Sequence, residues 1–145
     1  DGKDNYTYLI LGDGEMQEGQ VWEAVLLAAQ KKVNHLIAFV DYNKQQLDGY
    51  TKDINDMGDI KAKFDCFGWY AQEINGANIK EILIAIEKAK QEEERPSVIV
   101  LNTVKGKGCS FAEHVVLNHH MTISQTQMEE ALSALHTEME RLVTA

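Results

Sequence analysis

The chain alternates between short apolar segments and longer segments in which apolar residues recur every three or four positions. The short segments are continuously apolar and lie at residues 6–11, 35–42, 69–74 and 97–104. Such runs predict strands, and continuous apolar character is typical of strands whose two faces are both covered by helices. We therefore expect the strands at 6–11 and 35–42 to be buried.

The segments between these strands have helical periodicity. The first helix presents Val21, Trp22, Val25, Leu26 and Ala29 on one face. Asn55 is a candidate cap for a second helix, which would run through Phe64 and stop at Gly68.

Two further helices follow. Asn78 can cap a long helix that buries Ile79, Ile82, Leu83, Ile86 and Ala89, and Pro96 prevents its continuation. The last helix begins near Ser124 or Thr126. Its apolar stripe consists of Met128, Leu132, Leu135, Met139 and Leu142.

Strands and helices therefore alternate along the chain. This order predicts an α/β fold with a mostly parallel sheet and helices on both faces. At 145 residues, the chain has the length of one domain. We expect a single unit over 1–145, with polar loops after the strands at 43–49 and at "KGKG", residues 105–108.

Composition narrows the classes of function. The net charge of −9 argues against a nucleic-acid surface, because such a surface needs clustered Lys and Arg. We expect no membrane span, since no apolar run approaches about 20 residues, and no signal peptide at "DGKDNYTY". Cys66 and Cys109 do not form a CxxC pair, which favours reduced structural thiols in a cytoplasmic protein.

Asp13 and Asn43 are the candidate cation ligands. Asp13 follows the first strand and Asn43 follows the second, and ligands of parallel sheets bind beyond the carboxyl ends of the strands. Two oxygen-bearing side chains at one edge suit a hard divalent cation that also binds phosphates. Gly14 allows close backbone approach, and the following helix would direct free N–H groups at an anion.

A purely structural interpretation stays open, in which Asp13 caps a helix and Asn43 makes an Asx turn. Other ligand motifs fail in detail. The glycines do not form G-x-G-x-x-G, Gln20 and Val21 replace the Lys and Ser/Thr of a P-loop, and Gln46 occupies the glycine position of a calcium loop.

Three separated stretches, "GDGEMQEGQVWEA", "DYNKQQLDG" and "TVKGKGCSFAE", carry a family resemblance. Together they resemble the thiamine-diphosphate signature of transketolases, and are most similar to separately encoded amino-terminal subunits. The resemblance covers residues 1 to about 120. It implies the thiamine diphosphate-binding fold, present only in part, with a metal and diphosphate corner at 11–49 and a carboxyl-terminal loop and helix at 105–143.

The resemblance also implies roles for single residues. Mg²⁺ (or Ca²⁺) would be bound by Asp13, Asn43 and the backbone carbonyl of Gln45. Gly12 and Gly14 would lie against the diphosphate, and Leu47 would pack against the cofactor ring.

Further positions match acidic and imidazole groups of the family. Glu18 and Glu23 match residues that link two cofactor sites across a dimer, although an acidic helix start explains them equally well. His119 aligns with a histidine near the diphosphate and substrate, which makes it the candidate catalytic residue. In this chain His120 replaces the glycine that follows. His35, His114 and His136 are interpreted as non-catalytic.

By this resemblance the protein would transfer a two-carbon ketol unit between sugar phosphates. It would require a carboxyl-terminal subunit with the pyrimidine-binding domain, and a homo- or hetero-oligomer is expected. The family's earlier segment is not found upstream of residue 6, so we expect this chain to supply one corner of an active site and to be inactive alone. Two alternatives stay open: a 1-deoxyxylulose-phosphate synthase or 2-oxo acid dehydrogenase E1 type enzyme, and a non-catalytic assembly module.

Overall fold

A four-stranded parallel sheet forms the centre of the computed structural model, which describes residues 3–116 and 118–144. The strands lie in the order β1-β2-β6-β5. They comprise β1 (Thr7–Gly12), β2 (Leu36–Tyr42), β6 (Ser97–Asn102) and β5 (Tyr70–Asn75). All three pairings are parallel. The α/β class expected from the sequence is therefore confirmed.

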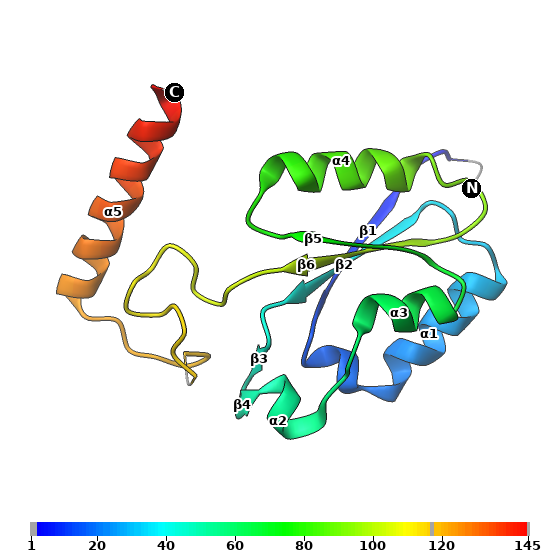
Figure 1. The fold of residues 1–145 in the computed structure, drawn as a ribbon, viewed down its shortest axis with the longest axis horizontal. Helices are drawn as coiled ribbons and strands as arrows, with labels where there is room; N and C mark the ends of the chain where they lie inside the picture. The colour runs from blue at the N-terminus through cyan, green and yellow to red at the C-terminus, as the bar shows by residue number, and fades with distance from the viewer. Residues whose placement is uncertain (1–2, 117, 145) are drawn as a thin grey trace.

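Helices cover both faces of this sheet (Figure 1). On one face lie α1 (Gly19–Gln30) and α3 (Ile60–Cys66), and on the other lies α4 (Ile79–Lys90). The larger core cluster contains Val25 and Phe64 against strand residues such as Val40. The smaller cluster packs Ala85 and Ala89 of α4 onto the opposite face.

The expectation that residues 6–11 form a buried strand is wrong. β1 lies at the edge of the sheet, where Tyr8 is 50% and Ile10 is 74% exposed, and Leu11 is its only buried apolar residue. β2 and β6 lie between neighbours: β6 is buried over most of its length, and β2 is buried or half-buried throughout. An apolar run indicates strand propensity, but the position of the strand in the sheet decides its burial.

The segment after β2 also differs from expectation. The loop expected at 43–49 contains a short antiparallel hairpin, β3 (Gln45–Gln46) with β4 (Gly49–Tyr50). A five-residue helix, α2 (Thr51–Asn55), follows at once. Asn55 therefore ends one helix instead of capping the next.

Asp59 is the residue that caps α3, because its Oδ1 accepts a hydrogen bond from Ala62 N at 2.8 Å. Asn78 caps α4 as predicted and accepts from the backbone N–H groups of Lys80 and Glu81. The last helix, α5 (Gln125–Val143), begins at Ser124 with a complete capping box. Each of these capping residues lies in the loop that leads into its helix.

In Figure 1, α5 stands apart from the sheet, beyond the loop that follows β6. All five residues of its predicted apolar stripe are at least 43% exposed. Of the described residues, no helix is long and apolar enough to cross a membrane. The single unit expected over 1–145 includes residues 1, 2, 117 and 145, which lie outside the described residues.

Candidate functional site

The register of β1 and β2 brings the two candidate cation ligands to the same edge of the sheet. Gly12 pairs with Asp41, so the chain leaves both strands at the same level. Asp13 N donates to Asp41 O at 3.3 Å and continues the pairing by one step. Asp13 therefore lies directly beside the loop that carries Asn43.

Asp13 is almost completely buried, with 2% of its surface exposed. Its Oδ1 accepts from Gly14 N at 2.9 Å, and its Oδ2 accepts from Lys44 N at 2.5 Å. The carboxylate thus ties the end of β1 to the loop after β2. The alternative in which Asp13 caps a helix is not formed, because Gly14 is the N-cap of the following short 3-10 helix, Glu15–Gln17.

Burial raises the pKa of the Asp13 carboxyl above its ordinary value. The two backbone N–H donors and the positive charge of Lys105 lower this pKa, while the negative charge of Asp41 raises it further. The net direction is upward. A buried carboxylate whose charge is only partly compensated is a favourable partner for a cation.

Asn43 uses both ends of its side-chain amide. Its Oδ1 accepts from Gln45 N at 3.0 Å, so the Asx turn of the structural interpretation is formed. Its Nδ2 donates to Asp41 Oδ2 at 2.9 Å. Asp41 Oδ1 in turn accepts from the Thr103 hydroxyl, which reaches across from the end of β6. The Asx turn leaves one lone pair of Asn43 Oδ1 free for a further partner.

One cavity of about 430 Å³ collects most of the residues predicted from the sequence. Asp13 is the buried acid among them. The predicted members of its lining are Gly12, Asp13, Gly14, Asn43, Gln45, Leu47 and His119. Glu15, Asp41, Gln46 and Lys105 complete the lining.

Glu18 does not join this group. It is exposed at the start of α1 and accepts from Gln20 Nε2 at 2.6 Å. Glu23 is likewise exposed, on α1 itself. Neither Glu18 nor Glu23 lines this cavity, so any role that they have lies elsewhere.

Lys105 and Asp41 are site residues that the sequence interpretation missed. Lys105 belongs to "KGKG", which was expected to be only a loop, and its Nζ lies 3.1 Å from His119 Nδ1. Asp41 stands two residues before Asn43 at the strand end. A second acid so close to a candidate ligand was the available signal for Asp41, whereas the Lys105–His119 contact depends on loop geometry.

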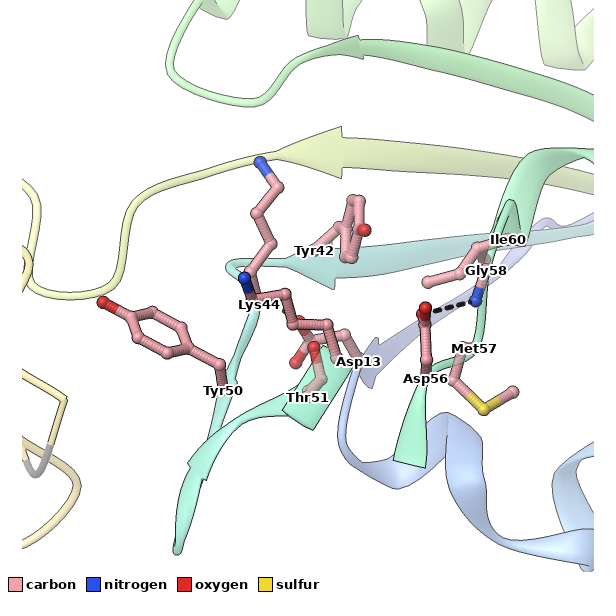
Figure 2. A pocket seen from close by; sticks show the side chains of 10 residues that line it. Asp13, Tyr42, Lys44, Tyr50, Thr51, Asp56, Met57, Gly58 and Ile60 are labelled. Carbon is pink, nitrogen blue, oxygen red and sulfur yellow. Dashed lines mark hydrogen bonds between the residues drawn. The ribbon is translucent and has the colours of Figure 1, made fainter. Parts of the chain in front are cut away.

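A second cavity of about 440 Å³ includes Lys44 in its lining (Figure 2). Asp13 lines both cavities, and Tyr42, Tyr50 and Thr51 belong to the second. Burial raises the pKa of the Tyr42 hydroxyl, and the charge of Asp13 adds to that rise. All the predicted site residues except Glu18 and Glu23 line the first cavity, which we therefore take as the candidate site.

The first cavity offers the donor set of a hard cation. Asp13 supplies a carboxylate, Asn43 an amide oxygen, and Gln45 carries a buried side-chain Oε1 that has no partner among the described residues. Gly14 allows the β3–β4 hairpin to approach closely, since a Cβ there would lie 2.9 Å from Gln46 Cβ. Oxygen ligands with space for phosphate fit Mg²⁺ or Ca²⁺.

This set contains a single carboxylate. Within residues 3–116 and 118–144, no three His, Cys, Asp or Glu side chains form a group that could hold a metal ion. A cation on this donor set would keep coordination positions for the oxygens of a ligand such as a phosphate.

Comparison with known proteins assigns the family. The family described as "Transketolase, thiamine diphosphate binding domain" matches residues 1–141. The chain belongs to this family. Its fold is accordingly that of the transketolase thiamine diphosphate-binding domain, as the resemblance of the three sequence stretches implies.

Some relatives within the transketolase family are named as subunits. A 6-deoxy-6-sulfo-D-fructose transketolase subunit from Clostridium sp. (strain MSTE9) is 46% identical over 92% of this chain and 49% of its own length. An apulose-4-phosphate transketolase subunit from Actinobacillus succinogenes is 39% identical over 94% of this chain and 49% of its own length. The chain thus spans about half the length of the curated relatives it matches.

A solved structure agrees with the family assignment. Transketolase from Campylobacter jejuni superposes with a TM-score of 0.83 and 29% identity, over 90% of this chain and 21% of that one. The transketolase fold therefore extends over nearly all of the present chain.

Proposed function

We propose that this chain forms the metal and diphosphate corner of a transketolase that transfers a two-carbon ketol unit between sugar phosphates. The observation that carries the proposal is the buried Asp13 carboxylate, which shares one cavity with Asn43 and Gln45. In a transketolase-family chain, this combination supports binding of thiamine diphosphate through Mg²⁺ (or Ca²⁺).

The cation would be held by Asp13, by Asn43 Oδ1 and by the backbone carbonyl of Gln45. Burial supports this role for Asp13, because a cation offsets the cost of an ionised carboxylate that water does not reach. Asn43 is held in place by hydrogen bonds at both ends of its amide. The proposed ligands are thus positioned before the cation arrives.

The diphosphate would lie against Gly12 and Gly14, which line the cavity without side chains of their own. Lys105 supplies a positive charge in the same cavity of a chain whose net charge is −9. Leu47 is half exposed at the rim, where its apolar surface is available to a ring. Glu18 and Glu23 would act only toward a neighbouring subunit, because both are exposed away from the cavity.

His119 is the proposed catalytic residue. Lys105 Nζ lies 3.1 Å from its Nδ1, and a lysine ammonium only donates hydrogen bonds. Nδ1 is therefore the accepting nitrogen, and the neutral ring carries its proton on Nε2. That N–H is then available to donate to a substrate oxygen or a phosphate oxygen at the cavity mouth.

Thiamine diphosphate supplies the carbanion chemistry that lets a carbon–carbon bond beside a ketose carbonyl break and re-form. The residues of this chain bind, orient and neutralise charge. We propose that activity requires an oligomer that includes a carboxyl-terminal partner subunit, and that the isolated chain is inactive. The names of the two relatives above support this, because they are subunits of transketolases. They also favour a transketolase over the synthase, dehydrogenase and assembly-module hypotheses.

The test measures binding of thiamine diphosphate and Mg²⁺ by calorimetry on the protein reconstituted with its partner subunit. Asp13→Ala should abolish Mg²⁺-dependent binding and turnover of a ketose phosphate with an aldose phosphate. Asp48→Ala is the matched control, because Asp48 is an exposed acid on the turn of the β3–β4 hairpin. Unchanged affinity in Asp13→Ala would overturn the metal assignment.

A further inference from the structure

We propose that Asp41 and Thr103 form a clamp that decides which end of the Asn43 side chain faces the cation. This inference rests on the proposed function, since it assigns positioning residues to the proposed metal site. It concerns two residues that are not themselves proposed ligands. Asp41 lies at the end of β2 and Thr103 directly follows β6.

The need for a clamp follows from the chemistry of asparagine. Its amide has a carbonyl oxygen at one end and an NH₂ group at the other, with nearly the same shape. Only the oxygen can bind a cation, and an amide turned by half a rotation would present two N–H groups to it. A site that uses Asn43 therefore needs a neighbour that distinguishes the two ends.

Asp41 makes this distinction. Its ionised carboxylate only accepts hydrogen bonds, so the end of Asn43 that faces it must be the NH₂ group. The contact joins Asn43 Nδ2 to Asp41 Oδ2 at 2.9 Å. Asn43 Oδ1 then points to the opposite side, where it meets Gln45 N at 3.0 Å, and Asn43 lines the same cavity as Asp13.

Thr103 fixes Asp41 in turn. The Thr103 hydroxyl donates to Asp41 Oδ1, the oxygen that Asn43 does not use. The backbone of Thr103 is tied to the same strand end, since its N–H donates to Tyr42 O at 3.3 Å. Both oxygens of Asp41 are therefore occupied by donors, and its rotation is restricted.

Gly76 packs closely against Thr103, on the side of its methyl group. A Cβ on Gly76 would lie 2.5 Å from Thr103 Cγ2 and 2.8 Å from Leu101 Cβ, so only glycine fits there. Gly76 N also donates to Asn102 O at 2.9 Å. A series of contacts therefore leads from Gly76 to Thr103, from Thr103 to Asp41, and from Asp41 to Asn43. It joins the ends of β5 and β6 to the Asn43 side chain.

The clamp explains why an acid stands at position 41. The charge of Asp41 repels that of Asp13, with which it shares the cavity, so the acid has an electrostatic cost. An asparagine at this position would avoid that cost, but its own amide could turn either end toward Asn43. The carboxylate is the group of this size that accepts at both oxygens.

The test compares metal affinities in a double-mutant cycle, on the protein bound to its partner subunit with thiamine diphosphate present. Mn²⁺ replaces Mg²⁺, so that bound metal is counted by electron paramagnetic resonance without any activity assay. Asp41→Asn should weaken Mn²⁺ binding by about 10-fold or more, the range typical for groups that orient metal ligands. Thr103→Val, which keeps the shape and removes the donor, should weaken it in the same direction.

The decisive step repeats Asp41→Asn in an Asn43→Asp background. A carboxylate at 43 has two equivalent oxygens and needs no orientation, so Asp41→Asn should not weaken binding there and removes a repulsion instead. This reversal separates positioning from a general structural role, which would cost affinity in both backgrounds. Equal losses in both backgrounds, or no loss with Asn43 present, would overturn the inference.

Asp13→Ala separates this inference from the proposed function. If Asp13→Ala abolishes Mn²⁺ binding while Asp41→Asn and Thr103→Val do not change it, the clamp is wrong and the metal site stands. If Asp13→Ala leaves binding unchanged, the metal site itself is wrong. Should Asp41→Asn not fold, as judged by its thermal midpoint, Thr103→Val carries the same comparison.

Discussion

Replacing Gly14 by alanine tests how tightly the β1 end and the β3–β4 hairpin approach each other. The backbone of Gly14 has φ −66° and ψ −38°, which alanine adopts without strain. The glycine is therefore needed for space and not for conformation. An added Cβ would lie 2.9 Å from Gln46 Cβ, whereas carbon atoms in contact are about 3.5–4.0 Å apart.

Two effects of opposite sign set the change in the free energy of unfolding on Gly14→Ala. Alanine reduces the entropy of the unfolded chain and by itself would stabilise by about 0.4–1 kcal/mol. Overpacking typically costs about 1–3 kcal/mol, and here Gln46 must shift in a hairpin strand of only two residues. We expect a net destabilisation of roughly 0.5–2 kcal/mol, together with weaker binding of thiamine diphosphate.

Gly19→Ala is the matched control, because a Cβ at Gly19 meets nothing within 4 Å. It lies at the first residue of α1, and alanine there should stabilise by about 0.5 kcal/mol. Urea unfolding at unchanged m-value gives both free energies. If Gly14→Ala is as stable as Gly19→Ala and binds the cofactor normally, the close approach at Gly14 has no consequence and the reasoning is refuted.

Three further outcomes are expected. First, burial raises the pKa of Asp13, so its carboxyl takes up a proton at higher pH in the folded protein than in the unfolded chain. As the pH falls through the folded pKa, this group therefore adds to the stability of the fold. The affinity for Mg²⁺, measured by calorimetry, declines over the same pH range. Phe64→Ala should cost about 3–5 kcal/mol in urea unfolding, because Phe64 is fully buried with its ring 5.2 Å from that of Trp69. Ser124→Ala removes the capping box and should weaken hydrogen-exchange protection in the first turn of α5 by about 1 kcal/mol, whereas Ser133→Ala within α5 should not.

Much of the fold follows from local features of the sequence. The helical periodicity around Val25 and the cap at Asn78 both act over a few residues, so their consequences can be predicted without knowing the rest of the chain. The segment between Asn43 and Phe64 was predicted less well. There, short polar stretches allow a cap, a turn or a hairpin with similar local energies, and pairing of Gln45 with Tyr50 selects the hairpin.

The candidate site was likewise predictable from the sequence only in part. Asp13, Asn43 and Gly14 could be selected from the sequence, because residues after neighbouring parallel strands must emerge at one edge. The contacts that orient them could not be predicted in this way. Asp41 and Thr103 are 62 positions apart, and Lys105 reaches His119 across a loop, so neither contact leaves a periodic pattern.

The order of strands and helices, and hence the parallel α/β class, was determined by the amino-acid sequence alone through propensity, periodicity and capping. The tertiary structure decided which strand lies at the edge, and so left Ile10 exposed despite its apolar run. It also placed Glu18 outside the cavity and set Asp41 against Asn43. These outcomes depend on strand order and register, which are fixed by contacts between distant segments and are therefore invisible in any single stretch of the chain.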